Sequence, residues 1–571
     1  MKSPARLPPP NPPGARLFQA AMVHYSKGEL AAAIPLFQQV LQGAPNAAAA
    51  LHFLGMAHHQ LKDGQPVLPL LRRAAELDPR QAAFALNLGL VLCELGQPAE
   101  ALTVLERARP HAPAMPELFN ILGQVHQQLG NLPAAIEHYE KAVRLQPAFP
   151  FALNNLGGAW SLTGRHAEAI RTLEKARQLE PRSPEILINL GRACRLAGRN
   201  PEAVESFRAA LALDPGNAEA TLGWAQLLEE SSQAAEALAL CQQALLRQPA
   251  RVPLLMQAGS LQRSLGQFEA AQASWAKALA AAPAHFPAWW QAGLSLPIIY
   301  LSEAEMADRR AAWLKGIQQT EAALAGRRFN PAGLALPQTN FNLHYQCCND
   351  REAQVIYGRV VTRIAEVCAA GLALPGRPPR TVPRKIRVGF VSAFFNLHTV
   401  FKLFHGWITR LDPSLFETHV FHFNPHRDKA TDFLQQHATT LTAGALPLNA
   451  AARAVAAAGL DILIYPDIGM DAMTQMLAAL RLAPVQCQAW GHPVTSGLPA
   501  MDYFLSSDLM EPADAQAHYC EKLVRLPGLS IRYPEPDASR AVRPRDCPMT
   551  TAPVCSSACN PCSSCCRCRT G

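Results

Sequence analysis

The segment Pro147–Pro181 reads PAFPFALNNLGGAWSLTGRHAEAIRTLEKARQLEP and is one unit of a repeat that fills the first half of the chain. Proline recurs every 34 residues, at Pro45, Pro79, Pro113, Pro147, Pro181, Pro215, Pro249 and Pro283. A small residue keeps the same spacing, at Ala21, Gly55, Gly89, Gly123, Gly157, Gly191, Ala225 and Gly259. Eight units in register do not arise by chance, so this half of the chain is predicted to be a repeat array.

Each unit has the pattern of two helices. Small residues let the helices approach closely, and a large apolar residue such as Tyr139 or Trp275 fills the gap to the next unit. Proline ends the second helix because it lacks the backbone N–H and clashes with the preceding turn. One helix pair cannot bury its apolar face alone, so the pairs must stack into an α-solenoid. The pattern resembles the tetratricopeptide superhelix.

Three asparagines share one position of the repeat, two residues before the small residue: Asn87, Asn155 and Asn189. In such a superhelix the first helix of each pair lines a concave groove. An amide side chain offers a donor and an acceptor, so these residues could grip the backbone of an extended peptide. The alternative is that they are solvated residues of the helix surface.

After residue 384 the pattern changes to short apolar runs that alternate with helical segments. The runs Ile386–Val391, 418–423, 461–465, 485–489 and 502–505 are predicted to be strands. Continuous apolar strands that alternate with helices predict a parallel sheet covered by helices on both faces. Ligands of such sheets bind beyond the carboxyl ends of the strands, where the loops 392–398, 466–471 and 491–497 would lie. No dinucleotide-binding or phosphate-loop glycine motif is present.

Several motifs in this part resemble the O-GlcNAc transferase family, which is glycosyltransferase family 41 and includes plant SPINDLY-type and bacterial members. They are IRVGFVS at Ile386–Ser392, NLH at Asn396–His398, LAPVQ at Leu482–Gln486, GHPVTSG at Gly491–Gly497 and MDY at Met501–Tyr503. A tetratricopeptide array in front of them strengthens the likeness. The resemblance implies two Rossmann-like lobes with the donor in the cleft between them, of which this chain carries the first.

The same resemblance implies an activity. A member of this family would transfer N-acetylglucosamine from UDP-N-acetylglucosamine to a Ser or Thr hydroxyl with inversion, on protein substrates guided by the array. It implies no cofactor and no metal, only the nucleotide-sugar donor. The donor sugar itself, whether N-acetylglucosamine, fucose or another, and the protein substrates cannot be read from the sequence.

His398 matches the histidine of the family's first active-site loop and is the candidate catalytic residue. A histidine of near-neutral pKa can deprotonate or orient the attacking hydroxyl. The alternative is that His398 only hydrogen-bonds the N-terminus of the following helix. We expect Asp467 to cap the helix that follows it rather than to line the cleft.

The later loop borders the cleft in the family, and its matching residues are candidates for the substrate or donor cleft. His492 stands where some members have tyrosine. The candidates in this loop are His492, Pro493, Thr495, Ser496 and Gly497.

The end of the chain departs from the family pattern. The second lobe should follow Tyr533 and needs about 150–200 residues. Only 38 residues remain, without any Leu, Ile, Phe, Tyr or Trp. We therefore expect a truncated chain that is inactive alone. Cys559, Cys562 and Cys565 have the spacing of metal ligands, but the abrupt change of composition favours a shifted reading frame over a metal site. The alternative function is a non-catalytic tetratricopeptide scaffold.

Composition and periodicity divide the chain into a disordered proline-rich leader, the repeat array, a junction with a linker, the Rossmann-like lobe and a disordered cysteine-rich tail. The predicted boundaries are 1–13, 14–300, 301–383, 384–535 and 536–571.

The overall composition excludes some classes of partner. The formal net charge of +8 is spread over 571 residues with no basic face, so a nucleic-acid partner is not expected. No apolar run reaches the roughly 18 residues of a membrane-spanning helix. Eight cysteines are scattered over residues 1–540, which is typical of a reducing compartment. The sequence therefore predicts a cytoplasmic protein.

Overall fold

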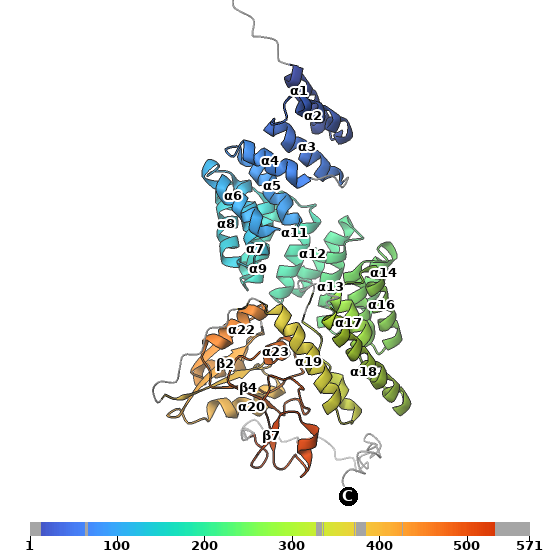
Figure 1. Ribbon diagram of the computed structural model, residues 1–571, viewed down its shortest axis with the longest axis vertical. Helices are drawn as coiled ribbons and strands as arrows, with labels where there is room; N and C mark the ends of the chain where they lie inside the picture. The colour runs from blue at the N-terminus through green and yellow to red at the C-terminus, as the bar shows by residue number, and fades with distance from the viewer. Residues whose placement is uncertain are drawn as a thin grey trace, which may run out of the picture. The chain divides into compact units, whose positions relative to one another are not determined.

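The computed structural model describes residues 13–62, 67–326, 334, 336–370, 372, 384–424 and 426–531 (Figure 1). The predicted leader before residue 13, the linker at 376–383 and the tail at 536–571 lie outside these residues. The chain forms two compact units, Met1–Gln248 and Pro249–Gly571.

The first unit is a stack of helix pairs, which confirms the predicted solenoid. Among its described residues there are seven pairs, and a short 3₁₀ turn, η1 (Arg109–His111), follows α6. The helices are α1 (Pro13–Ser26), α2 (Leu30–Gly43), α3 (Ala48–Leu61), α4 (Val67–Leu77), α5 (Ala82–Glu94), α6 (Pro98–Ala108), α7 (Pro116–Gln128), α8 (Leu132–Leu145), α9 (Pro150–Leu162), α10 (His166–Leu179), α11 (Pro184–Leu196), α12 (Asn200–Leu213), α13 (Ala218–Glu230) and α14 (Ala234–Arg247).

The packing inside each pair explains why the repeat keeps a small residue. Gly123 of α7 lies under the ring of Tyr139 in α8, and a Cβ at Gly123 would come within 2.5 Å of that ring. Gly191 of α11 lies in the same way against Phe207 of α12, at 2.8 Å. Both aromatic rings are fully buried. A side chain at the small position would therefore separate the two helices of the pair.

The second unit begins with the eighth helix pair, α15 (Val252–Ser264) and α16 (Phe268–Ala281). An incomplete ninth pair follows as α17 (Phe286–Leu294), and the period then ends. The next elements are α18 (Glu303–Ala325), η3 (Phe341–Gln346) and α19 (Arg351–Cys368).

These junction helices share one apolar core with the lobe that follows them. Trp290 of α17, Trp313 of α18 and Tyr357 of α19 belong to a buried cluster that also contains Tyr465 and Met476 of the lobe. Gln475 donates a hydrogen bond of 2.7 Å to the buried Tyr357 hydroxyl. The segment that the sequence described as a junction is thus part of the lobe's own core.

The lobe is a parallel α/β sheet, as predicted. Its seven described strands run in the order β3-β2-β1-β4-β5-β6-β7. The elements are β1 (Ile386–Val391), α20 (Thr399–Thr409), β2 (Phe416–His422), α21 (Lys429–His437), β3 (Thr440–Ala443), α22 (Leu448–Ala457), β4 (Ile462–Tyr465), α23 (Ala472–Ala478), β5 (Val485–Ala489), β6 (Tyr503–Ser507), η4 (Ala515–His518) and β7 (Lys522–Leu526).

Alternate residues of the strands face different helices, which makes three layers. Phe390 of β1 packs with Ile408 of α20 and Leu434 of α21 on one face. Its neighbour Val391 packs on the other face with a cluster that includes residues of α19, α22 and α23. Phe390 pairs with Val420 on one side and with Ile464 on the other, so β1 lies at the centre of the sheet.

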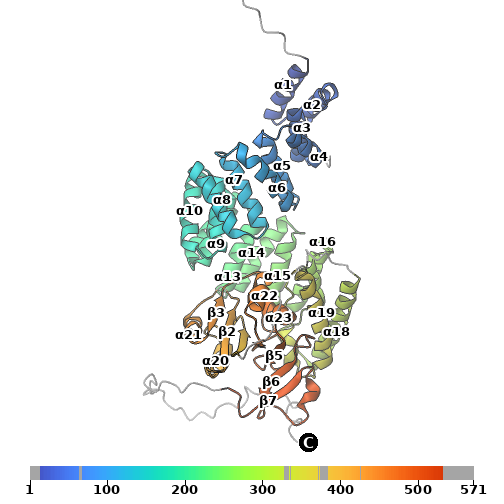
Figure 2. The same ribbon diagram turned by 60° about the vertical axis from the view of Figure 1, so that its left-hand side comes forward.

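The sequence did not predict the two edge strands, which Figure 2 labels β3 and β7. Both are short, and two charged residues, Lys522 and Arg525, interrupt the apolar residues of the edge strand β7, KLVRL. The continuous apolar pattern used to find the strands applies to strands that are covered on both faces. An edge strand with one exposed side does not show it.

Candidate active site

The strand order reverses between β1 and β4, and sheets of this kind bind ligands beyond the carboxyl ends of the strands at such a point. Ser392 follows β1 there, and Asp467 follows β4. Asp467 is fully buried, and neither of its carboxylate oxygens has a hydrogen-bond partner of good geometry among the described residues. Burial raises the pKa of Asp467 to about 8, with the Ser392 hydroxyl acting in the opposite direction.

The expectation that Asp467 caps a helix is wrong. Asp471 is the N-cap of α23, and its carboxylate accepts hydrogen bonds from the backbone N–H of Thr474 at 2.8 Å and from the Thr474 hydroxyl at 3.0 Å. Asp467 precedes this cap by four residues and points into the protein instead. A buried carboxyl without a partner is costly, so its position at the reversal point marks it as a functional candidate.

A pair of histidines lies beside the loop that follows β5. His492 is only 3% exposed, and its Nε2 lies 3.3 Å from Nδ1 of His344 in η3. His492 also forms a hydrogen bond with the backbone carbonyl of Ile468. Burial, together with His344, lowers the pKa of His492 to about 3. The His492 ring is therefore neutral at physiological pH.

The sequence did not identify His344, because η3 precedes the predicted lobe and has no strand or helix pattern of its own. Burial also lowers the pKa of His344, whose Nδ1 faces the carbonyl of Phe341. The Phe341 ring lies 5.2 Å from the ring of His492. Residues of the junction thus complete the environment of a loop far along the chain.

His398 lies at the N-terminus of α20, where it is the N-cap. Its Nδ1 accepts a hydrogen bond of 3.2 Å from the backbone N–H of Val400, and its ring stacks on Phe394 with centroids 4.6 Å apart. Burial and the nearby Lys402 lower the pKa of His398. Because Nδ1 is the acceptor, the proton of the neutral ring is on Nε2. This is the helix-terminal role that the sequence left open, and a catalytic role remains a prediction.

The polar residues of the candidate loop point inward. Thr495 and Ser496 are 2% and 7% exposed, and both bind the carboxylate of Glu521, the residue before β7. The Thr495 hydroxyl donates at 2.5 Å and the backbone N–H of Ser496 at 2.9 Å, and the Ser496 hydroxyl donates as well. Gln488 of β5 fixes the other side by donating to the Val494 carbonyl at 2.9 Å.

Of the predicted cleft residues, His492, Thr495, Ser496 and Gly497 are buried, and Pro493 alone is exposed. Pro493 borders a cavity of about 220 Å³ that Asp350, Glu511 and Tyr519 also line. The loop therefore presents a rigid wall to the cleft rather than a set of free hydroxyls. Its role in substrate or donor binding stays a prediction.

Glu521 is the residue that holds this loop, and sequence reasoning missed it because it lies outside every motif. We expect Glu521→Gln to lower the free energy of opening of the loop by about 2–3 kcal/mol, because an amide nitrogen replaces one acceptor of three buried donors. Hydrogen exchange at the Ser496 amide measures this opening. Glu366→Gln, at a carboxylate whose side chain is 56% exposed, should leave the exchange unchanged. Equal protection in both variants would contradict the assignment.

The three asparagines of the array form hydrogen bonds between consecutive repeats. In each case Nδ2 reaches a residue of the preceding first helix, at 2.9–3.1 Å. The pairs are Asn87 with His52, Asn155 with Asn120, and Asn189 with Asn154. Arg192 donates to Oδ1 of Asn189 at 3.4 Å. The amide groups thus link neighbouring repeats. Of these three asparagines, Asn87 and Asn155 have a side-chain oxygen to which no described residue donates.

A possible metal-ligand cluster lies in the first unit, in the repeat array. Glu106, His126 and His138 bring one ligand atom each within 4.8 Å of one another. Arg109 already pairs with Glu106 at 2.8 Å. The cluster is built from residues of α6, α7 and α8, so it is no part of the candidate active site.

No helix among the described residues has the length and apolar character needed to cross a bilayer.

Both the repeat array and the α/β lobe match known protein families. Residues 363–530 match the family described as Glycosyl transferase family 41. Tetratricopeptide repeat families match residues 18–65, 80–148, 121–184, 163–218, 195–249 and 252–285.

Similar proteins include several transferases. A probable UDP-N-acetylglucosamine–peptide N-acetylglucosaminyltransferase SPINDLY of Arabidopsis thaliana is 44% identical over 61 residues, which are 10% of this chain and 7% of the relative. A UDP-glucose:protein N-beta-glucosyltransferase of Actinobacillus pleuropneumoniae is 36% identical over 75 residues, 13% of this chain and 12% of the relative. A UDP-N-acetylglucosamine–peptide N-acetylglucosaminyltransferase of Caenorhabditis elegans is 28% identical over 149 residues, 25% of this chain and 13% of the relative.

The matches therefore span 7–13% of the length of these relatives. Among solved structures, a mutant of the Thermobaculum terrenum O-GlcNAc transferase aligns with 75% of this chain and 60% of its own, at 17% identity and a TM-score of 0.28.

Proposed function

Because the chain carries tetratricopeptide repeats followed by a glycosyltransferase family 41 domain, we propose that it serves the transfer of N-acetylglucosamine from UDP-N-acetylglucosamine to Ser or Thr hydroxyls of proteins. The family match at residues 363–530 is the observation that carries the proposal. The lobe's site supports it, since Asp467, His492 and His398 gather at the carboxyl edge of the sheet. The reaction needs no metal or cofactor in this proposal, and it takes place in the cytoplasm.

The lobe forms the acceptor side of the cleft. Inverting transfer needs a hydroxyl aimed at the anomeric carbon and stabilisation of the departing diphosphate. His398 carries its proton on Nε2, because Nδ1 accepts the backbone N–H of Val400 at the N-terminus of α20. In this state the ring donates a hydrogen bond and orients an oxygen. For Nε2 to act as a base, the proton must move from Nε2 to Nδ1. Nδ1 must therefore first lose its hydrogen bond from the Val400 N–H.

The array guides the protein substrate in this proposal. The free acceptors are the side-chain oxygens of Asn87 and Asn155, because their amide nitrogens bind neighbouring repeats. They would accept hydrogen bonds from the backbone N–H groups of an extended peptide. The contact would therefore use the side-chain oxygens alone, and not the paired donor and acceptor that was one of the two alternatives from the sequence.

The proposal is tested by supplying a donor-binding lobe. The described residues contain one Rossmann-like sheet, so the chain through Ile531 is joined to the second lobe of a family 41 transferase and incubated with UDP-N-acetylglucosamine and protein extract. We expect labelled Ser and Thr residues. His398→Ala should lower kcat by about 100-fold or more, because a group that orients or deprotonates the acceptor is lost.

His437→Ala is the matched control, because His437 is an exposed histidine of the neighbouring helix α21 and should leave kcat unchanged. If the chimera binds peptides but transfers no sugar, the alternative of a non-catalytic tetratricopeptide scaffold is the better description. UDP-glucose in place of UDP-N-acetylglucosamine tests the donor named for the Actinobacillus relative.

A further inference from the structure

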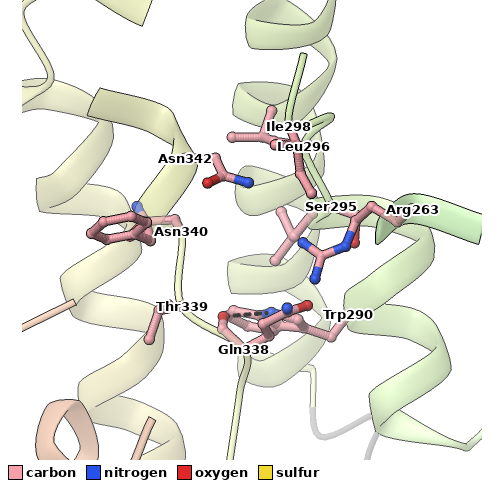
Figure 3. A pocket seen from close by; sticks show the side chains of 11 residues that line it. Arg263, Trp290, Ser295, Leu296, Ile298, Gln338, Thr339, Asn340 and Asn342 are labelled. Carbon is pink, nitrogen blue, oxygen red and sulfur yellow. Dashed lines mark hydrogen bonds between the residues drawn. The ribbon is translucent and has the colours of Figure 1, made fainter. Parts of the chain in front are cut away.

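A cavity of about 280 Å³ lies within the second unit, between α15, α17 and the segment Gln338–Asn342 (Figure 3). Trp290, Leu294 and Leu296 form its apolar wall. Arg263 extends from α15 into the space between Ser295 and Trp290, as Figure 3 shows.

Arg263 has no counter-ion among the described residues. Its Nε is buried and lacks a hydrogen-bond partner, and no described carboxylate lies within ion-pair distance. Burial lowers the pKa of Arg263, but a guanidinium remains charged at neutral pH. Arg263 as a whole is half-buried, and a partly desolvated charge without a partner is unfavourable. Folding has therefore already removed part of the water around this cation, which lowers the cost of binding an anion in the cavity.

The hydrogen bonds of the lining residues show which groups are free for a ligand. Asn340 donates to Gln354 at 3.1 Å, and the Gln338 carbonyl accepts from the Trp290 indole at 3.0 Å. The Thr339 hydroxyl and the Asn342 amide have no hydrogen bond within the described part of the chain. The cavity thus offers one positive charge, two neutral polar groups and an apolar wall.

We propose that this cavity binds a carboxylate, with the guanidinium of Arg263 as its ion-pair partner and Thr339 and Asn342 as further donors. A single positive charge balances the single negative charge of a carboxylate, whose planar shape matches the guanidinium fork. A phosphate dianion would bring a second charge that no lining residue neutralises. The wall of Trp290 and Leu294 fits the carbon stem that carries the acid group.

The cavity borders the candidate active site through Phe341. This residue lines the cavity, and its ring lies 5.2 Å from the ring of His492. A carboxylate bound here would be held next to the loop after β5. The carboxylate can belong to an acidic side chain of a polypeptide or to a small carboxylic acid. Binding at this site does not depend on the proposed sugar transfer.

The test measures binding to the full chain with two pairs of probes. Butyrate and its neutral isostere butyramide are compared by saturation-transfer NMR. A labelled pentapeptide with a central glutamate is compared by fluorescence anisotropy with the same peptide carrying glutamine at that position. We expect a carboxylate probe to bind and its neutral twin not to bind. Binding of butyrate alone identifies a small acid as the ligand, and tighter binding of the glutamate peptide identifies a polypeptide.

Arg263→Gln should weaken carboxylate binding by about tenfold or more, because a charge-assisted pair is lost. Arg251→Gln, at the exposed N-cap of the same helix, is the matched control and should bind as the unchanged chain does. Arg263→Lys should bind with intermediate affinity, which keeps the test valid if the glutamine variant folds poorly. Equal affinity for acid and amide probes, or unchanged binding by Arg263→Gln, would overturn the proposal.

Discussion

Gly497→Ala is expected to destabilise the second unit by more than about 4 kcal/mol, because both the backbone conformation and the space at this position exclude a side chain. Gly497 has a φ of +67°. A Cβ there would lie 1.9 Å from the carbonyl oxygen of Gln354 and 2.2 Å from its carbonyl carbon. Both atoms belong to the backbone of α19, so no side-chain rotation relieves the clash. Urea unfolding followed through the tryptophans of the second unit measures the loss.

Gly528→Ala separates the two causes. Gly528 has a φ of +64°, but a Cβ there would meet no atom within 4 Å. Only the backbone strain remains, so we expect a loss of about 1–2 kcal/mol. A loss at Gly497 no larger than the loss at Gly528 would show that α19 does not pack on the loop in solution.

The facing glycine of α19 gives a reciprocal test of the same contact. A Cβ at Gly358 would lie 2.0 Å from the carbonyl oxygen of Gly497, whereas a Cβ at Gly406 of α20 would meet no atom within 4 Å. Gly358→Ala should therefore be as damaging as Gly497→Ala. Gly406→Ala should be neutral or stabilising by up to about 1 kcal/mol, because alanine favours a helix.

The contact between Gly497 and Gly358 could not be predicted from the sequence, whereas the contacts of the repeat array could. The array was predictable because every contact that defines it recurs at a fixed spacing, as Gly123 with Tyr139 does. Gly497 was instead assigned to a cleft on the strength of its motif, and its contact with Gly358 has no local pattern. The partners of a close backbone approach lie far apart in the chain, and only the fold brings them together.

The candidate site also contains residues that the sequence could predict and residues that it could not. The positions of His398 and of the loop after β5 were predictable, because strand ends follow from the apolar pattern. Their partners were not, because Glu521 lies in front of an edge strand and His344 in the junction. The helix cap was assigned to Asp467 although Asp471 stands at the N-cap. Two acidic residues near a helix start cannot be distinguished without knowing where the helix begins.

Asp467→Asn is expected to raise the stability of the second unit at pH 7 by up to about 4 kcal/mol, because the folded protein holds this carboxyl in its protonated form. Its pKa is raised from 3.8 to about 8 by burial. Between these values the folded state binds a proton that the unfolded state has released, so the stability of the unchanged chain falls as the pH rises from about 4 to about 8. Asparagine resembles the protonated acid and does not titrate. Urea unfolding of both chains from pH 4 to pH 9 measures the difference.

The pH profile distinguishes this cause from a simple change of packing. The gain from Asp467→Asn should be small near pH 4, where the acid is protonated in both states, should grow through neutral pH, and should level off above about pH 8. Asp432→Asn replaces a carboxylate whose side chain is 68% exposed and should reproduce the pH profile of the unchanged chain. A gain of the same size at every pH would mean that Asp467 is not protonated in the fold. A loss at pH 7 would mean that its carboxylate has a partner, and that the edge of the sheet at β1 and β4 is held by an ionised group.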